Sequence, residues 1–136
     1  MNYWLLKTEP ETFSWDNLEK EKTSMWDGVR NFQARNNLRK MEKGDIAFFY
    51  HSGKIPGIVG IAEVVKEHYP DPTAIEGDWS VIEVKPVRKL KRTITLQEIK
   101  QNEALKNMFL VRNTRLSVQP VMPEEFKFVM DLEELS

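Results

Sequence analysis

Ile46-Ala47-Phe48-Phe49-Tyr50 is the longest purely apolar run of the chain, and the turn-forming pair Gly44-Asp45 stands directly before it. A short apolar run bounded by a turn signal is typical of a buried β-strand. A run of this length is far too short to span a bilayer, so it does not predict a membrane segment. The sequence therefore places a core strand near the first third of the chain.

Further short strands and helices are expected on both sides of this run. Strands are predicted at residues 3–7, 58–66, 79–92 and 115–121, and Gly60 predicts a bulge or a close backbone approach within the second of these. Helices are predicted from an N-cap at Ser14 to about Lys20, over residues 31–41, after a capping box at residues 95–98, and from Pro123 onward.

The order of these elements favours an α+β fold. No helix of about ten residues regularly follows each strand, which argues against a doubly wound parallel sheet. We expect a small, strongly curved β-barrel of five to six strands with short flanking helices. The chain has 136 residues, the usual size of one domain, so residues 1–136 are predicted to form a single domain.

Several classes of chemistry lack the residues they need. The chain has no cysteine, which excludes disulfides, zinc–thiolate sites and thiol nucleophiles. Its two histidines, His51 and His68, do not have metal-ligand spacing, and neither a nucleophile elbow nor a phosphate-binding loop occurs. We therefore expect no enzyme, no cofactor and no metal. Without a signal peptide or a membrane span, a cytoplasmic prokaryotic protein is expected, nuclear only if the source is eukaryotic.

The charge is neutral in total but unevenly distributed. The formal net charge is −1, yet residues 84–115 hold nine Lys or Arg against two Glu, which gives +7 for that segment. Such a segment can bind a polyanion despite a neutral total. A solvated strand face is the alternative reading, and charge alone leaves both open.

Trp26 is the most informative of the four tryptophans. It lies in the polar context Met25-Trp26-Asp27-Gly28, just before the predicted helix at 31–41. A tryptophan there is either a plug over the end of the barrel or a stacking platform, and a stacked base contributes roughly 1–3 kcal/mol. Asp27 and Asn31 stand where they can read the polar edge of such a base.

The chain resembles the EVE domain family along nearly its whole length. The resemblance rests on four stretches: residues 3–15, which begin Tyr3-Trp4-Leu5-Leu6-Lys7-Thr8-Glu9-Pro10; residues 26–38, which read Trp26-Asp27-Gly28-Val29-Arg30-Asn31-Phe32-Gln33-Ala34-Arg35-Asn36-Asn37-Leu38; residues 48–52; and residues 115–120. It implies a PUA-like barrel related to YTH domains. It also implies binding of a modified base, with 5-methylcytosine and 5-hydroxymethylcytosine in DNA as the leading candidates.

The resemblance assigns candidate residues to a base-binding pocket. By analogy with YTH domains these are Lys7, Thr8, Trp26 and Asp27, to which we add Asn31, Arg35, Tyr50, His51 and Ser52, with Ser14, Trp15 and Trp79 as possible walls and Ser117 and Gln119 from the polar face of strand 115–121. Phosphates would be held by Arg30, Arg39, Lys85, Arg88, Lys89, Lys91 and Arg92, so binding should depend steeply on salt.

Three other functions are kept as alternatives. The first is an RNA-binding PUA-like module. The second is an enzyme that acts on a modified base, with Asp27 or His51 perturbed in the pocket, which a mass change of the oligonucleotide would reveal. The third is a protein-interaction domain whose aromatic residues are only core, which a pull-down with and without nuclease would distinguish. No membrane partner is expected, and the oligomeric state is open.

Overall fold

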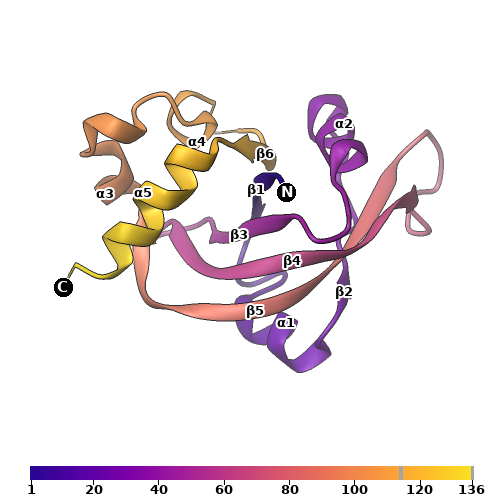
Figure 1. Ribbon diagram of the computed structural model, residues 1–136. Coiled ribbons are helices and arrows are strands. Elements are labelled where there is room, and N and C mark those ends of the chain that lie inside the picture. Colours follow the sequence, from indigo (N-terminus) through magenta and orange to yellow (C-terminus); the bar gives the residue numbers. More distant parts are fainter. Residues whose placement is uncertain (114, 136) are drawn as a thin grey trace.

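The computed structural model describes residues 1–113 and 115–135, and it is built on one six-stranded sheet (Figure 1). The strands are β1 (Tyr3–Thr8), β2 (Ser24–Met25), β3 (Ile46–His51), β4 (Gly57–Pro70), β5 (Ser80–Thr95) and β6 (Val118–Val121). The helices are α1 (Trp15–Glu21), α2 (Phe32–Lys40), α3 (Leu96–Lys100), α4 (Phe109–Arg112) and α5 (Pro123–Glu133), with a 3-10 turn at Glu103–Leu105. None of the helices within these described ranges is long and apolar enough to cross a membrane.

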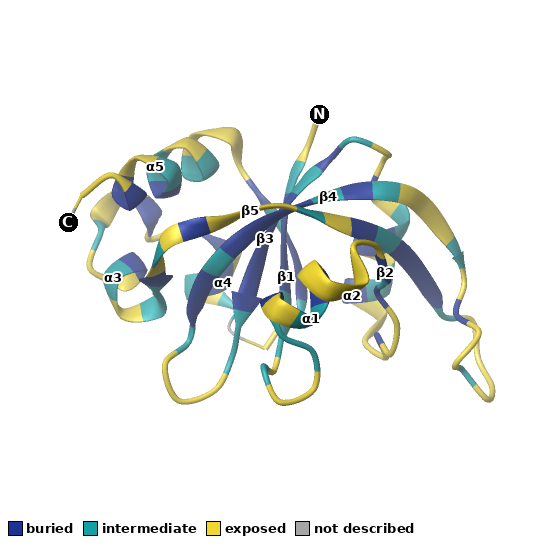
Figure 2. Cartoon of the chain, turned by 90° about the horizontal axis from the view of Figure 1, so that it is seen from below, coloured by how far each residue is buried: buried dark blue, intermediate teal, exposed yellow. Residues whose placement is uncertain are grey.

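The sheet has the order β2-β5-β4-β3-β1-β6 and therefore two edges, β2 and β6. β1 runs parallel to β3, and every other neighbouring pair is antiparallel. β4 and β5 curve strongly across the molecule (Figure 2). The α+β class and the number of strands agree with the prediction. Of the expected curved barrel, the structure shows the curved sheet, whose pairings among the described residues do not close.

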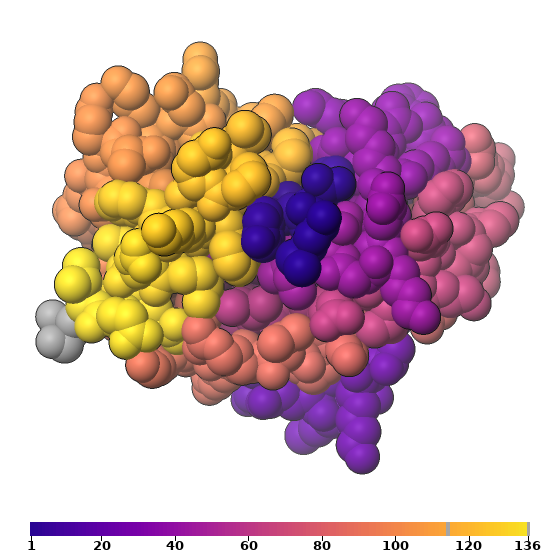
Figure 3. Space-filling view, viewed as in Figure 1, coloured from indigo at the N-terminus to yellow at the C-terminus, as the bar shows by residue number. Residues whose placement is uncertain are grey.

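The central strands are buried on both faces. Leu6 and Phe49 face one core with Trp15 of α1, whereas Leu5 and Phe48 face a second core, which holds residues of α3, α4 and α5. This two-sided burial explains why β3 is a continuous apolar run rather than an alternating one. On the second side the first strand contacts the start of α5, where the Tyr3 and Phe126 rings stack 4.1 Å apart, and the first residues lie at the surface beside the segment around the start of α5 (Figure 3).

Local sequence signals set the helix starts. The Ser14 hydroxyl accepts a hydrogen bond from the Asn17 N–H at 3.1 Å, and the Thr95 hydroxyl accepts one from the Glu98 N–H, also at 3.1 Å. α5 begins at Pro123, as predicted. One expectation is wrong: Gln119, predicted on the polar face of strand 115–121, is buried, and its amide donates to the carbonyls of Asn113 and Leu116.

Gly60 is a point of close approach between β4 and α1. A Cβ atom built on Gly60 would lie 2.5 Å from Cζ3 of the Trp15 indole, which is fully buried. The β4–β5 register also shifts between Ile58 and Gly60. The bulge and the close backbone approach predicted at this glycine are both present, because the indole occupies the space of a side chain.

Gly60→Ala should therefore lower the free energy of unfolding by about 1–3 kcal/mol, the usual range for overpacking a core. Urea denaturation of the wild type, Gly60→Ala, Trp15→Phe and the double variant measures this loss. The smaller Phe ring relieves the clash, so the double variant should lose less than the sum of the single changes. Additive losses would show that the indole does not require this glycine.

His51 connects the end of β3 to the start of α1. Its Nε2 accepts a hydrogen bond from the Trp15 backbone N–H at 3.1 Å, so this nitrogen carries no proton. Burial is the main cause that lowers the pKa of His51; the Lys89 charge lowers it further, while Asp16 and Glu11 oppose the shift. A protonated ring would also place a positive charge at a helix N-terminus. His51 is therefore a neutral structural acceptor.

The pKa of His51 is lower in the folded chain than in the unfolded chain, so the unfolded chain binds the proton at a higher pH. The stabilising effect of His51 should be complete above about pH 6.5 and decline as the pH falls through the lower folded-state value. The unfolding free energy of the wild type, measured from pH 7.5 to 5, should fall more steeply than that of His51→Gln. His68→Gln is the matched control, because His68 is exposed on β4. Parallel curves for the wild type and His51→Gln would contradict this role.

Candidate functional site

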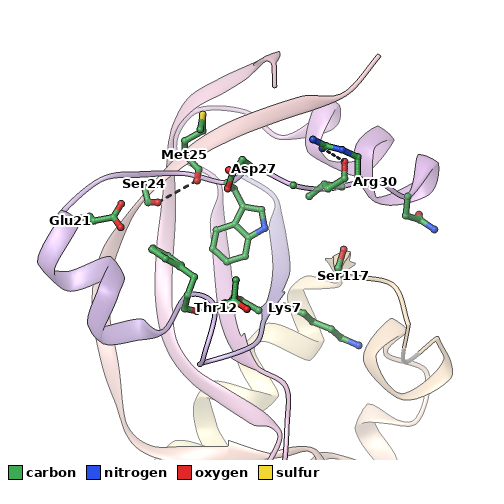
Figure 4. A pocket seen from close by; sticks show the side chains of 14 residues that line it. Lys7, Thr12, Glu21, Ser24, Met25, Asp27, Arg30 and Ser117 are labelled. Atoms are coloured by element: carbon green, nitrogen blue, oxygen red, sulfur yellow. Dashed lines mark hydrogen bonds between the residues drawn. The ribbon is translucent and has the colours of Figure 1, made fainter. Parts of the chain in front are cut away.

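A cavity of about 520 Å³ opens between the end of β1 and the segment that leads into α2 (Figure 4). Lys7 and Thr12 lie on one side of it, and Met25, Asp27 and Arg30 lie on the other. Its volume is within the range of small-molecule sites, about 300–1,000 Å³. Seven of the predicted residues line it together: Lys7, Thr8, Trp26, Asp27, Arg30, Asn31 and Ser117.

Trp26 forms an aromatic wall of the cavity. Its ring is 5.6 Å from the Phe49 ring and 6.1 Å from the Phe13 ring, both at interplanar angles of 86°. Its backbone N–H donates to the Ile82 carbonyl at 2.8 Å, which ties the segment to β5. The residue is 7 % exposed, and it borders the cavity. The indole is therefore fixed by the core and adjacent to open space, as a stacking surface requires.

The polar groups of the cavity supply both donors and acceptors. The Oδ1 atom of Asn31 accepts from the Ala34 N–H at 2.9 Å as the N-cap of α2, which leaves its amide nitrogen as the donor. Asp27 is exposed and offers carboxylate acceptors. Lys7 offers an ammonium whose pKa is lowered by burial. The Thr8 hydroxyl donates to the Phe13 carbonyl at 2.9 Å, so it is engaged in holding the cavity wall.

A buried carboxylate fixes the segment that carries these groups. The side chain of Asp71 is fully buried and accepts from the Gly28 N–H at 3.1 Å and from Arg30 at 2.9 Å. Thr73 donates to it through its backbone N–H and its hydroxyl. Although burial raises the pKa of Asp71, these hydrogen bonds lower it to about 2. The ionised carboxylate thus connects the β4–β5 loop to the cavity wall.

Four predicted residues hold the start of α1 and the β1–β3 junction instead of lining the cavity. Ser14 caps α1, Trp15 packs on Gly60, and His51 accepts from the Trp15 N–H. The Ser52 hydroxyl donates to the Thr8 carbonyl at 3.3 Å. Two of them are next to lining residues, since Ser14 follows Phe13 in the chain and Ser52 bonds to Thr8.

Two further candidates are buried elsewhere in the protein. Tyr50 is 2 % exposed and belongs to the core on the opposite face of the sheet, where burial raises its pKa to about 12. Gln119 is 1 % exposed and holds the turn before β6. Neither borders the cavity.

Arg35 and Trp79 lie outside the cavity but close to its rim. The Trp79 ring stacks on Phe32, the first residue of α2, with centroids 5.2 Å apart and an interplanar angle of 13°. The Arg35 guanidinium is 5.0 Å from the Phe32 ring and 5.8 Å from the Trp79 ring. Arg30, which lines the cavity, also lies over Trp79 at 5.6 Å.

Most of the predicted phosphate-binding cations have carboxylate partners. Arg88 forms a two-pronged pair with the buried Glu133 at 2.7 and 2.8 Å, and Arg92 pairs with Glu98. The remaining pairs are Lys91 with Glu134, Arg30 with Asp71 and Arg39 with Asp78. Two of these carboxylates, Glu133 and Glu134, come from outside the +7 segment, and they reduce its net charge to +5. Lys85 and Lys89 are exposed and have no ion pair within the described part of the chain.

Sequence reasoning missed half of the cavity lining: Thr12, Phe13, Glu21, Ser24, Met25, Gly28 and Val29. Five of these lie within residues 21–29, directly before or between predicted positions. The polar stretch that leads to Trp26 is continuous with it and forms one wall of the cavity. This continuity could have predicted these five residues. Phe13 was harder to predict from the sequence, because its contact with Trp26 joins residues that are 13 positions apart. No cluster of metal-ligating side chains occurs among residues 1–113 and 115–135.

Comparison with known proteins places this site in a family. The model of the EVE domain matches residues 2–132. Thymocyte nuclear protein 1 of Mus musculus is 45% identical over 167 aligned positions, which cover 98% of this chain and 74% of the relative. Two solved structures are each 42% identical. The human THYN1 protein in complex with DNA containing 5-methylcytosine has a TM-score of 0.93 and covers 100% of this chain and 99% of its own. A protein of Agrobacterium tumefaciens has a TM-score of 0.94, with coverages of 99% and 94%. This chain belongs to the EVE domain family.

Proposed function

We propose that this protein is a non-enzymatic reader of a modified cytosine in DNA, 5-methylcytosine or 5-hydroxymethylcytosine, which it holds against Trp26. The observation that carries the proposal is the Trp26 indole, which is fixed by the core and borders a cavity of about 520 Å³. The similar human protein has been crystallised with DNA containing 5-methylcytosine. The curved, open sheet serves as an incomplete PUA-like barrel, and residues 1–136 act as one domain.

The polar groups match the edge of a cytosine. Cytosine presents one exocyclic amine donor, while its ring nitrogen and carbonyl oxygen accept. In the proposal, Asp27 accepts from the amine, and the amide nitrogen of Asn31 donates to an acceptor on the ring. The cap bond to Ala34 fixes which end of the Asn31 amide faces outward, so the site favours one hydrogen-bond pattern.

The modification at the 5-position meets an apolar wall. Val29 and Phe13 line the cavity beside Trp26 and offer carbon contacts. A methyl group buried against them gains roughly 0.8 kcal/mol, a small but usable preference over unmodified cytosine. Extrusion of the base from the duplex costs a few kcal/mol, which stacking on Trp26 and contacts to the backbone must exceed.

Trp26→Leu tests the proposal, because it removes the aromatic face while keeping part of the volume. Affinity for a duplex with one 5-methylcytosine, measured by fluorescence anisotropy at fixed salt, should fall about 5- to 150-fold, as expected for the loss of roughly 1–3 kcal/mol of stacking. The same series with 5-hydroxymethylcytosine and with unmodified cytosine measures the preference. An unchanged affinity in a folded variant would reject the pocket.

Trp4→Leu is the matched control. Trp4 is 5 % exposed in the same core as Trp26 but does not line the cavity, and its indole donates to Asp45. Both variants should lower the melting temperature, and only Trp26→Leu should weaken binding of the methylated duplex. If both variants weaken binding alike, the effect of Trp26 is one of stability.

A further inference from the structure

An aromatic pair outside the core, one ring of which is exposed, lies beside the cavity. Phe32 is 65 % exposed and stacks on Trp79, which comes from the loop between β4 and β5. A large apolar ring at this exposure loses the free energy that burial would supply. Its position at the start of α2, directly after the cavity residue Asn31, places it at the rim of the site.

The pair is held in place by its surroundings. Gly77 has a positive φ of +92°, and a Cβ built on it would lie 2.6 Å from Nε1 of Trp79, so the loop backbone packs directly on the indole. Arg30 lies over the same ring and is itself anchored to the buried Asp71. Trp79 is therefore a fixed support for Phe32 and not a freely moving surface side chain.

One face of Phe32 remains open. The Arg35 guanidinium is 5.0 Å from Phe32 and 5.8 Å from Trp79, and the two rings are 5.2 Å apart. Because these three distances are nearly equal, Arg35 lies beside the stack and does not cover the face of Phe32 opposite Trp79. A planar ring placed on that face would extend the existing stack by one layer.

The charge beside this open face favours a nucleic acid. Arg35 has no carboxylate partner within the described ranges; its guanidinium donates to the Asp78 carbonyl and the Asn36 side chain. Arg30 adds a second guanidinium, although its charge is balanced by Asp71. Aromatic rings flanked by arginines are the usual means of stacking bases while holding the adjoining phosphates.

We propose that the open face of Phe32, supported by Trp79 and flanked by Arg35, stacks a second nucleobase next to the one held against Trp26. This inference rests on the proposed function and extends it, since Arg30 belongs to both places. When a base leaves the duplex, its neighbours lose a stacking partner, and an apolar side chain at the opening replaces that contact. The second site then stabilises the opened duplex without reading its sequence.

Phe32→Ala separates this site from the pocket. With a duplex carrying one 5-methylcytosine, its affinity should fall about 5- to 150-fold, the equivalent of one stacked base. With the nucleoside 5-methyl-2′-deoxycytidine, which occupies only the pocket, affinity measured by NMR titration should not change. Phe32→Trp should restore duplex binding to within a few-fold. Ile75→Ala is the matched control: Ile75 is a fully exposed apolar residue of the same β4–β5 loop, and its removal should have no effect.

A 2-aminopurine placed next to the modified cytosine reports the stack directly. Its fluorescence should be quenched on binding to the wild type, and the quenching should be lost in Phe32→Ala. The inference is overturned if duplex affinity and quenching survive in Phe32→Ala, or if nucleoside and duplex affinities fall together. It is also overturned if Phe32→Ala abolishes only self-association in light scattering. Loss of duplex binding in Phe32→Ala with none in Trp26→Leu would reject the pocket and retain the stacking site.

Discussion

The Phe49 ring joins the core of this protein to its cavity. Its centroid lies 5.4 Å from the Trp15 ring, 5.6 Å from the Trp26 ring and 6.3 Å from the Phe13 ring. Each aromatic pair contributes about 0.5–1.5 kcal/mol beyond the area it buries. Trp15 fixes α1 on the sheet, whereas Trp26 borders the cavity. The position of the cavity wall therefore depends on a residue in the middle of β3, buried on all sides.

The second constraint is electrostatic and acts on the segment that follows Trp26. Asp71 is ionised in a fully buried position, which is favourable only because backbone and side-chain donors surround it. Two of those donors, the Gly28 N–H and the Arg30 guanidinium, belong to the cavity wall. Removal of the carboxylate would leave the Gly28 N–H unpaired and remove the ion pair of Arg30, so the loop between β4 and β5 determines the shape of a site it does not line.

The sequence predicted what depends on short-range patterns. The apolar run at 46–50, the caps at Ser14 and Thr95 and the glycine at 60 each have a local physical reason, and each is present. Four of the six residues from 26 to 31 were predicted, because they lie in one continuous segment around Trp26. Strand alternation explains the wrong placement of Tyr50: it follows Phe49 directly, and successive side chains of a strand point to opposite faces.

Long-range pairing could not be read from the sequence in the same way. Arg88 and Glu133 are 45 residues apart, and nothing local indicates that α5 folds back along β5 to neutralise its cations. The charge of a basic stretch is counted from the sequence before its ion-pair partners are known. The count therefore overestimates the electrostatic attraction that the stretch exerts on a polyanion. The arginines around Phe32 differ in this respect: Arg35 donates to a carbonyl and an amide oxygen, which leave its charge in place. In a nearly neutral protein of this kind, an unbalanced guanidinium beside a stacked aromatic pair directs nucleic-acid binding more than the total number of lysines and arginines does.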